Sequence, residues 1–264
     1  MFSREILVQC KKLAREAGAE ILKIYDTNFN FKIKADKSPL TLADRKSNEM
    51  IVKGLVENFP DYAILSEESR DDKSRLTNDY CFIVDPLDGT KEFIKKNGQF
   101  TVNIALAYKH KIVVGVIYVP VTGDLYYASK DYGSYIEKVQ NGELGLEKRR
   151  LQVTNKVKNL IMVSSKSHSS EKEAKLIEAN NDKIKETISA GSSLKGCMVA
   201  SGEADVYYRF GLTSEWDTAA MQCIVEEAGG IFRQMDGTEM LYNRENTLNE
   251  KGFYVVNRKE NIWV

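Results

Sequence analysis

The stretch 81–100 constrains this chain more than any other part of the sequence. Its apolar run 81–84 is typical of a buried strand, and Pro86 predicts that the strand ends at Asp85, because proline has no N–H to donate to a sheet ladder. Asp88 then opens an Asp-Gly turn, so the two carboxylates would lie on one tight bend. Clustered oxygen ligands on a rigid backbone suit a hard cation such as Mg²⁺, although a simple acidic turn has the same composition.

The composition excludes several classes of protein. The chain has 264 residues, of which 42% are apolar and 29% are charged, and its formal net charge is zero. These values are ordinary for a soluble globular protein. A neutral chain is a poor binder of polymeric nucleic acid or of anionic membrane surfaces. No apolar run is long enough to predict a transmembrane segment.

The cysteines and the N-terminal segment bear on the compartment. The four cysteines form no Cys-x-x-Cys pair, which indicates small core residues in a reducing compartment rather than disulfides or zinc ligands. The first residues lack the apolar core of a signal peptide. We therefore expect a cytoplasmic protein, with peripheral association with a membrane left open and the oligomeric state not indicated. The cysteines are Cys10, Cys81, Cys197 and Cys223.

The order of the predicted elements divides the chain in two. Helical spacing predicts amphipathic helices over about 4–25 and 41–59, and β-rich runs joined by short turns form a meander from 101 to 153. Beyond about residue 155, short strands and helices alternate. We predict a mixed α+β and α/β fold, with an N-terminal domain of helices on an antiparallel sheet over 1–155 and a smaller α/β domain over 156–264.

Further acidic residues stand at the ends of predicted elements. Glu67 follows a short strand over 62–65, as Asp85 follows its own strand, so neighbouring strands would bring the two carboxylates together. Asp44 and Asp217 each lie at the start of a predicted helix. Local explanations exist as well, namely a solvated acidic loop for Glu67, a capping box with Thr41 for Asp44, and a helix N-cap for Asp217 and for Ser192.

Four of these acidic residues share one explanation, which is a site for two or three Mg²⁺ ions. Such a site clamps a phosphate, activates a water molecule and stabilises the leaving oxygen. Two divalent cations need roughly this much negative charge for neutrality. The four residues are Glu67, Asp85, Asp88 and Asp217.

Three segments resemble the signature segments of the inositol monophosphatase superfamily, whose members are Mg²⁺-dependent, lithium-inhibited phosphomonoesterases. Their order and spacing match, and the resemblance covers nearly the whole chain. Residues 85–106 and 191–210 are more similar to the 3'(2'),5'-bisphosphate nucleotidase branch, since Lys-Glu-Phe follows Thr90 where inositol monophosphatases usually have Thr-Asn-Phe. The three segments are Glu67-Glu-Ser69, Asp85-Pro-Leu-Asp88-Gly-Thr90 and Trp216-Asp-Thr-Ala-Ala220.

The resemblance implies a role for each matching residue of the metal centre. Asp44 and Thr90 match the pair that activates the attacking water. This agrees with the ability of a threonine hydroxyl to pass a hydrogen bond from water to a carboxylate base. The implied metal ligands are Glu67, Asp85, Asp88, Asp217 and the carbonyl oxygen of Leu87.

Substrate contacts follow from the same resemblance. His168 matches a position near the nucleotide base, and Gly89 and Thr90 would bring backbone N–H groups to the scissile phosphate. Glu67, Leu87, Asp88 and Asp217 would also contact the substrate through the metal site. The residues expected to bind the phosphates of the nucleotide are Ser192, Lys195 and Arg209.

The implied reaction is hydrolysis of adenosine 3',5'-bisphosphate to AMP and phosphate by direct in-line attack of water. Mg²⁺ would lower the pKa of the water and offset the charge of the transferring phosphoryl group. The resemblance also implies a five-layer αβαβα architecture. In sulfur metabolism, such an enzyme clears a by-product of sulfate activation and sulfotransfer, so the expected partner is a small nucleotide bisphosphate.

Other assignments are weaker or stay open. The Asp-x-Asp-Gly-Thr loop of haloacid-dehalogenase phosphatases has one residue fewer between its aspartates. An EF-hand would need ligands where 85–96 has Leu87, Gly89 and Lys96. The complete set of site residues argues against a noncatalytic phosphate- or metal-binding relative. Inositol monophosphatase activity, or activity on another small phosphomonoester, is the open alternative, because it would use the same metals and water. A bisphosphate, unlike a monophosphate, needs cations such as Lys195 and Arg209 away from the metals.

Overall fold

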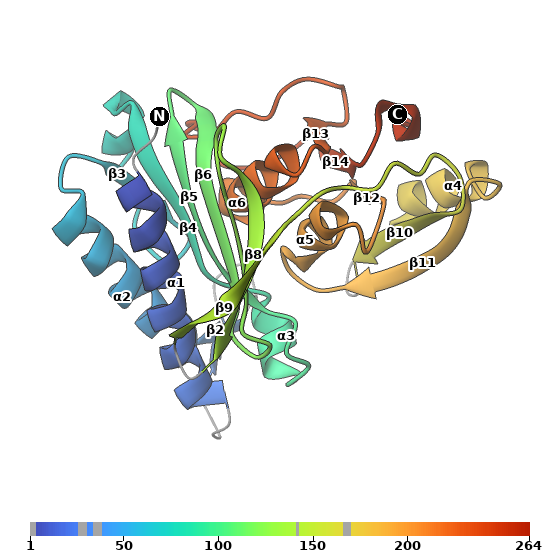
Figure 1. Cartoon of the computed structure of the whole chain (residues 1–264). Helices are drawn as coiled ribbons and strands as arrows, with labels where there is room; N and C mark the ends of the chain where they lie inside the picture. The colour runs from blue at the N-terminus through green and yellow to red at the C-terminus, as the bar shows by residue number, and fades with distance from the viewer. Residues whose placement is uncertain (1–3, 26–30, 34–38, 141–142, 166–169) are drawn as a thin grey trace.

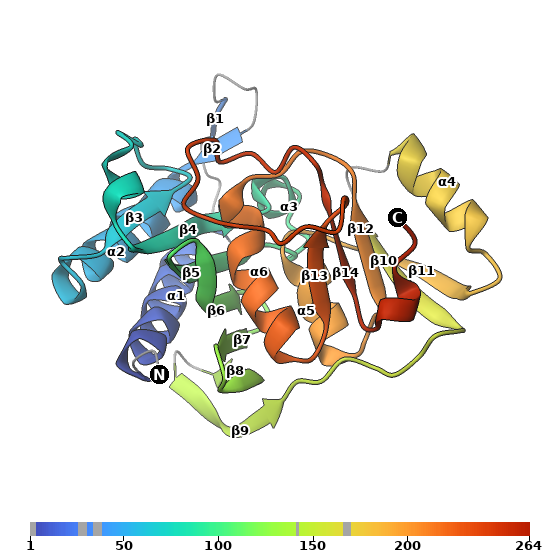
Figure 2. The same cartoon turned by 90° about the horizontal axis from the view of Figure 1, so that it is seen from above.

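The computed structural model describes residues 4–25, 31–33, 39–140, 143–165 and 170–264. In this part of the chain, helices and two β-sheets stack as five alternating layers (Figures 1 and 2). Helices α1 (Arg4–Tyr25) and α2 (Leu42–Asn58) form the first layer, and α4 (Glu171–Ala179) forms the last. The αβαβα arrangement implied by the resemblance is therefore confirmed.

The larger sheet has seven strands in the order β3-β4-β5-β6-β7-β8-β9. β3 runs parallel to β4, and the other pairs are antiparallel, as the predicted meander requires. Apolar side chains of α1 and α2 pack against one face of this sheet and form a buried core. The strands are β3 (Ala63–Ser66), β4 (Tyr80–Asp88), β5 (Thr101–Tyr108), β6 (Lys111–Val119), β7 (Asp124–Ser129), β8 (Gly133–Gln140) and β9 (Glu143–Arg150).

The smaller sheet has five strands in the order β11-β10-β12-β14-β13. β10 pairs in parallel with β11 and β12, whereas β14 is antiparallel to β12 and β13. Helix α4 covers its outer face, where Leu176 and Ile177 pack on a separate core. The strands are β10 (Leu160–Ser165), β11 (Ile184–Ala190), β12 (Val206–Arg209), β13 (Ile231–Gln234) and β14 (Phe253–Val256).

Two helices fill the space between the sheets. α5 (Leu194–Ser201) and α6 (Glu215–Glu227) share one buried cluster with side chains from both sheets. α6 packs very closely on β6 at Gly115. A Cβ atom at this position would lie 2.5 Å from the carbonyl oxygen of Ala220, so only glycine permits this approach. This packing holds the start of α6 beside the end of β4. The division into two domains near residue 155 stays a prediction.

β4 does not end where its sequence predicts. The strand continues through Pro86 to Asp88, with an irregular register between Asp85, which pairs with Asn103, and Asp88, which pairs with Thr101. Two residues of β4 therefore oppose one residue of β5, which is the pattern of a β-bulge. A bulge tolerates proline because the local ladder is already interrupted. The prediction that the strand stops at Asp85 is wrong, and Asp88 is held by the sheet itself.

The remaining features agree with the sequence. All four cysteines are buried and free, which confirms their assignment as core residues. Within the described ranges, no helix is long and apolar enough to cross a membrane. The short elements are β1 (Phe31–Ile33), β2 (Pro39–Thr41), α3 (Thr90–Ile94) and the 3₁₀ turns Ser74–Thr77 and Lys259–Asn261.

Candidate active site

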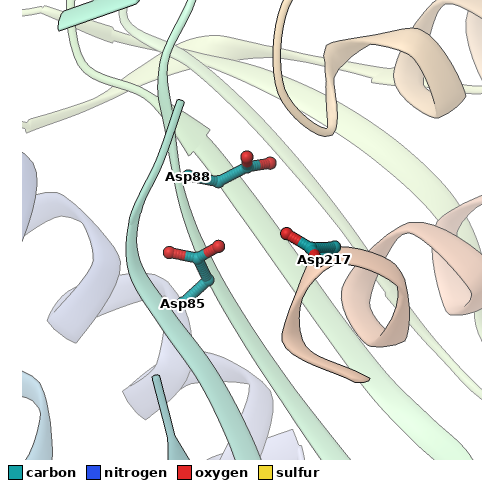
Figure 3. A group of neighbouring side chains, drawn as sticks. All are labelled: Asp85, Asp88 and Asp217. Carbon is teal, nitrogen blue, oxygen red and sulfur yellow. The ribbon is translucent and has the colours of Figure 1, made fainter. Parts of the chain in front are cut away.

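Three carboxylates meet where β4 ends beside the first turn of α6 (Figure 3). Asp85 and Asp88 come from β4, and Asp217 comes from α6. Each residue offers one carboxylate oxygen, and the three oxygens lie within 4.8 Å of one another. The structure thus brings together, from segments far apart in sequence, three of the four acidic residues predicted for the metal site. We call this group the carboxylate cluster.

Glu67 lies next to the carboxylate cluster but is not one of its three members. It follows β3, and its backbone N–H donates to the carbonyl oxygen of Val84 over 3.2 Å. β3 and β4 are parallel neighbours, so the predicted juxtaposition of their ends is correct. Burial raises the pKa of Asp85 well above its usual value, and the charge of Glu67 raises it further.

Asp217 is fixed by the start of its own helix. Ser214 is the N-cap of α6 and its backbone N–H donates to Asp217 Oδ2 over 2.6 Å. The predicted N-cap role of Asp217 is therefore wrong: the residue lies at the third helical position, and its carboxylate reaches back to the N-cap, as in a capping box. Burial, followed by the charge of Asp88, raises the pKa of Asp217 to about 7.

These groups fit a hard divalent cation. The three donors of the carboxylate cluster are all oxygen atoms. The carbonyl oxygen of Leu87, which the resemblance implies as a further ligand, lies 3.5 Å from Thr90 Oγ1. Neighbouring carboxylates with raised pKa values repel one another, and this repulsion is relieved when protons or cations bind between them. Oxygen-rich, negatively charged sites of this kind suit Mg²⁺ or a similar ion. A cation bound here would displace protons from Asp85 and Asp217.

The side chain of Asp88 is held by the N-cap residue of α5 and by two residues of strand β5. The backbone N–H and the hydroxyl of Ser193 both donate to Asp88 Oδ2, over 2.6 and 2.7 Å. Asn103 Nδ2 lies 3.3 Å from the same oxygen, and Thr101 Oγ1 lies 3.5 Å from it. Our sequence interpretation assigned no role to these partners. Thr101 and Asn103 could have been noticed in the sequence, because they are polar residues at alternate positions of an otherwise apolar strand.

Asp44 and Thr90, the two residues that we predict to activate water, contact each other. Thr90 Oγ1, at the start of α3, donates to Asp44 Oδ2 over 3.3 Å. Asp44 comes from the first turn of α2 and its side chain is fully buried. The predicted capping box would involve the side chain of Thr41, which lies outside the described side chains. The contact between Asp44 and Thr90 therefore supports the functional interpretation of Asp44.

A pocket of about 300 Å³ opens beside the carboxylate cluster. The lining of the pocket includes both carboxylates, among them Asp88 and Asp217, and cationic groups, among them Lys195 and Arg209. Polar residues predicted for the substrate lie on its wall, so that the two parts of the predicted site share one cavity. The predicted residues that line it are Asp88, Gly89, Thr90, Ser192, Lys195, Arg209 and Asp217.

Lys195 is the buried cation of this pocket. Its side chain is almost fully enclosed, and its Nζ donates to the carbonyl oxygen of Ser192 over 2.5 Å. Burial lowers the pKa of Lys195 to about 8, and the charge of Arg209 lowers it as well. Ser192 adopts a left-handed conformation, with φ of 46°, and the N-cap of α5 is Ser193. The predicted capping role of Ser192 is therefore wrong, because the helix starts one residue later. His168 lies outside the described residues.

The comparison with known proteins agrees with this geometry. The profile of the Inositol monophosphatase family matches residues 3–262. The 3'(2'),5'-bisphosphate nucleotidase CysQ of Salmonella typhimurium is 39% identical over 253 residues, which cover 95% of this chain and 99% of that protein. The CysQ protein of Escherichia coli K12 is 38% identical over the same shares of the two chains.

Solved structures show the same relationship. The crystal structure of CysQ from Bacteroides thetaiotaomicron, a bacterial member of the inositol monophosphatase family, has a TM-score of 0.84 and 40% identity, and the match covers 98% of this chain and 99% of that one. An inositol monophosphatase of Thermotoga maritima has a TM-score of 0.78 and 26% identity, over 96% and 92% of the two chains. With its five layers, its carboxylate cluster and these relatives, the chain belongs to the inositol monophosphatase family.

Proposed function

We propose that the protein hydrolyses adenosine 3',5'-bisphosphate to AMP and phosphate, with Mg²⁺ bound at the carboxylate cluster. Hydrolysis of phosphoric monoesters is the activity of the family, and the bacterial relatives at 38–39% identity are named 3'(2'),5'-bisphosphate nucleotidases. The choice of metal, the number of ions, the direct attack by water and the role of each residue belong to the proposal.

The observation that carries the substrate assignment is the mixed lining of the pocket. Its carboxylates, Asp88 and Asp217, suit a phosphate that is bridged by cations. Its cationic residues, Lys195 and Arg209, suit a second anionic group without a metal. An inositol monophosphate has one phosphate and would not need both sets of groups. A nucleotide with two phosphates would use both.

The protein groups then divide the chemical work. When bound, divalent cations would lower the pKa of the attacking water and offset the charge of the phosphoryl group. Thr90 Oγ1 would accept a hydrogen bond from that water while it donates to Asp44, so that Asp44 receives the proton as general base. Backbone N–H groups of Gly89 and Thr90 would bind the scissile phosphate. Lys195 and Arg209 would orient the nucleotide through its other phosphate.

The test is phosphate release with Mg²⁺ from adenosine 3',5'-bisphosphate and, side by side, from inositol 1-phosphate. We expect kcat/KM to favour the nucleotide by at least about 100-fold, since the second phosphate adds charge-assisted hydrogen bonds in the transition state. A preference for inositol 1-phosphate would preserve the chemistry and overturn the substrate. No turnover of either ester with Mg²⁺ present would overturn the proposal as a whole.

A further inference from the structure

Ser193 lies at the N-cap of α5, but its hydroxyl does not cap the helix. Serine is favoured at this position because its oxygen accepts a hydrogen bond from a backbone N–H of the first turn. Ser193 makes no such bond. Its hydroxyl instead donates to Asp88 Oδ2 over 2.7 Å, and its backbone N–H donates to the same oxygen over 2.6 Å. The backbone N–H of Ser193 therefore serves one carboxylate of the larger sheet. The hydroxyl faces the same carboxylate at 2.7 Å and, at the longer distance of 3.1 Å, the carbonyl oxygen of Asp217.

A neighbouring amide fixes the direction of the hydroxyl. Asn103 Nδ2 donates to Ser193 Oγ over 2.9 Å, and Thr101 Oγ1 donates to Asn103 Oδ1 over 2.8 Å. A serine hydroxyl has one proton, and two acceptors face it, Asp88 Oδ2 at 2.7 Å and the carbonyl oxygen of Asp217 at 3.1 Å. The carboxylate is the nearer and the charged acceptor, so it forms the stronger hydrogen bond. The Ser193, Asn103 and Thr101 side chains are at most 1% exposed, so water does not compete for these bonds.

The arrangement selects which oxygen of Asp88 serves the cluster. Within the described part of the chain, the hydrogen bonds to Asp88 all end on Oδ2. Oδ1 is therefore left for other ligands. The charges of Asp85 and Asp217 also repel that of Asp88, and the hydrogen bonds from Ser193 offset this repulsion. Hydrogen bonds behind a ligating carboxylate fix its orientation and commonly tune metal affinity.

We propose that Ser193 is a positioning residue that holds Asp88 Oδ2 and thereby presents the other oxygen of Asp88 to the metal. The proposal rests on the proposed function in one respect, namely that the carboxylate cluster binds divalent cations. Ser193 also follows Ser192, whose carbonyl accepts from Lys195. Two consecutive residues therefore contact both Asp88 and the buried Lys195 of the pocket.

The test compares Ser193→Ala with Ser201→Ala in the full chain. Ser201 lies at the other end of the same helix, where its hydroxyl faces two local acceptors, Glu203 Oε1 at 2.9 Å and the carbonyl oxygen of Met198 at 3.2 Å. Mg²⁺ and Mn²⁺ binding is measured by calorimetry without substrate, and kcat and KM are measured with adenosine 3',5'-bisphosphate. For Ser193→Ala we expect metal affinity to fall about 10-fold or more, kcat to fall in parallel, and KM to change by less than about 2-fold. Ser201→Ala should match the wild type in all three.

Asn103→Ala is the second variant, and it keeps the inference testable if Ser193→Ala fails to fold. It should weaken metal binding less than Ser193→Ala, and the two losses should not add in the double variant, because both act on the same carboxylate. Wild-type metal affinity in Ser193→Ala, or in Asn103→Ala if that variant alone folds, would overturn the inference. So would a higher KM with unchanged metal binding. A wild-type protein that binds Mg²⁺ but does not hydrolyse the nucleotide would overturn the proposed function alone, because the metal titration still tests Ser193.

Discussion

Thr90 and Asp44 contact each other across the interior of the protein: Thr90 Oγ1 on α3 donates to Asp44 Oδ2 on α2 over 3.3 Å. The contact couples a hydroxyl on the wall of the pocket to a carboxylate that has no access to solvent. In the proposed mechanism, a proton from the attacking water would therefore reach a buried base through a single hydroxyl group.

This pair makes the first prediction. Thr90→Ala and Asp44→Asn should each lower kcat by about 10²–10⁴-fold, the usual contribution of general acid–base catalysis. KM should change little, because neither group is proposed to bind the second phosphate of the substrate. Steady-state kinetics with adenosine 3',5'-bisphosphate checks this, and Thr77→Ala is the matched control, since Thr77 is bonded only to a nearby carbonyl at the surface. Near-normal kcat in Asp44→Asn would remove Asp44 from catalysis.

Lys195 makes the second prediction, which concerns substrate choice. Lys195→Ala should raise KM for adenosine 3',5'-bisphosphate by about 10–100-fold, because a charge-assisted hydrogen bond is lost, and hardly affect small sugar monophosphates. The control is Lys175→Ala, a lysine that pairs with Glu171 at the surface. An equal loss on both kinds of substrate would count against a bisphosphate site.

The pKa of Lys195 gives the third prediction. Burial lowers this pKa to about 8, so the side chain loses its charge as the pH rises through about 8. KM for the bisphosphate should therefore rise above pH 8, and this rise should be absent in Lys195→Arg, whose guanidinium stays protonated. The pH profiles of KM for the two proteins decide the matter. A rise of the same size in both would place the titration elsewhere.

The raised pKa values of the carboxylate cluster make the fourth prediction. Asp217 has a pKa of about 7, and burial raises that of Asp85 as well, so metal must displace protons below neutral pH. Affinity for Mg²⁺ should increase as the pH rises from about 5 to above 7. Calorimetry in two buffers of different ionisation enthalpy should detect proton release at pH 6. Binding that is independent of pH would contradict the prediction.

Stability without metal should show the opposite trend, which is the fifth prediction. The pKa of Asp217 is higher in the folded protein than its ordinary value of 3.8, so the folded state binds more protons than the unfolded state between about pH 4 and 7. Stability then falls as the pH rises through this range. Asp217→Asn keeps a hydrogen-bond acceptor for Ser214 and removes the charge, so it should abolish turnover and raise the Tm in EDTA at pH 7.5 by about 2–4 °C, equivalent to about 1 kcal/mol.

The control for this fifth prediction is an aspartate with the opposite shift. Hydrogen bonds from Lys251 and Thr238 lower the pKa of Asp236 to about 2, so its charge favours the folded state at neutral pH. Asp236→Asn should leave turnover intact and should not raise the Tm. At pH 4, where Asp217 is already protonated, Asp217→Asn should melt like the wild type. A lower Tm for Asp217→Asn at pH 7.5 would contradict the argument.

Much of the fold could be predicted because its signals are local. The helices α1, α2, α4 and α6 follow from apolar spacing, and the meander from β5 to β9 follows from alternation and turn residues. The end of β4 could not be predicted in this way. Pro86 is a strand breaker in general, but the bulge between Asp85 and Asp88 accommodates it, and a bulge depends on the partner strand rather than on the local sequence.

The candidate site shows the same division. Asp85, Asp88 and Asp217 could be predicted from motifs that keep their spacing along the chain. The positioning role of Ser193 could not be predicted, because it depends on a tertiary contact between the start of α5 and Asp88 on the larger sheet. The predicted N-caps are Ser192 and Asp217, and the observed ones are Ser193 and Ser214. Several nearby polar residues could cap each helix, and tertiary contacts determine which of them does.

The close packing of α6 on Gly115 has a consequence for the order in which the active site assembles during folding. Asp217 reaches Asp88 only after a helix encoded late in the chain has docked on a sheet encoded early. A nascent or truncated chain would have Glu67 and the β4 carboxylates but would lack Asp217, so under the proposed function it would bind metal less tightly. Turnover therefore requires that α6 has folded onto the sheet. The activity measured in a crude extract would be proportional to the amount of fully folded protein.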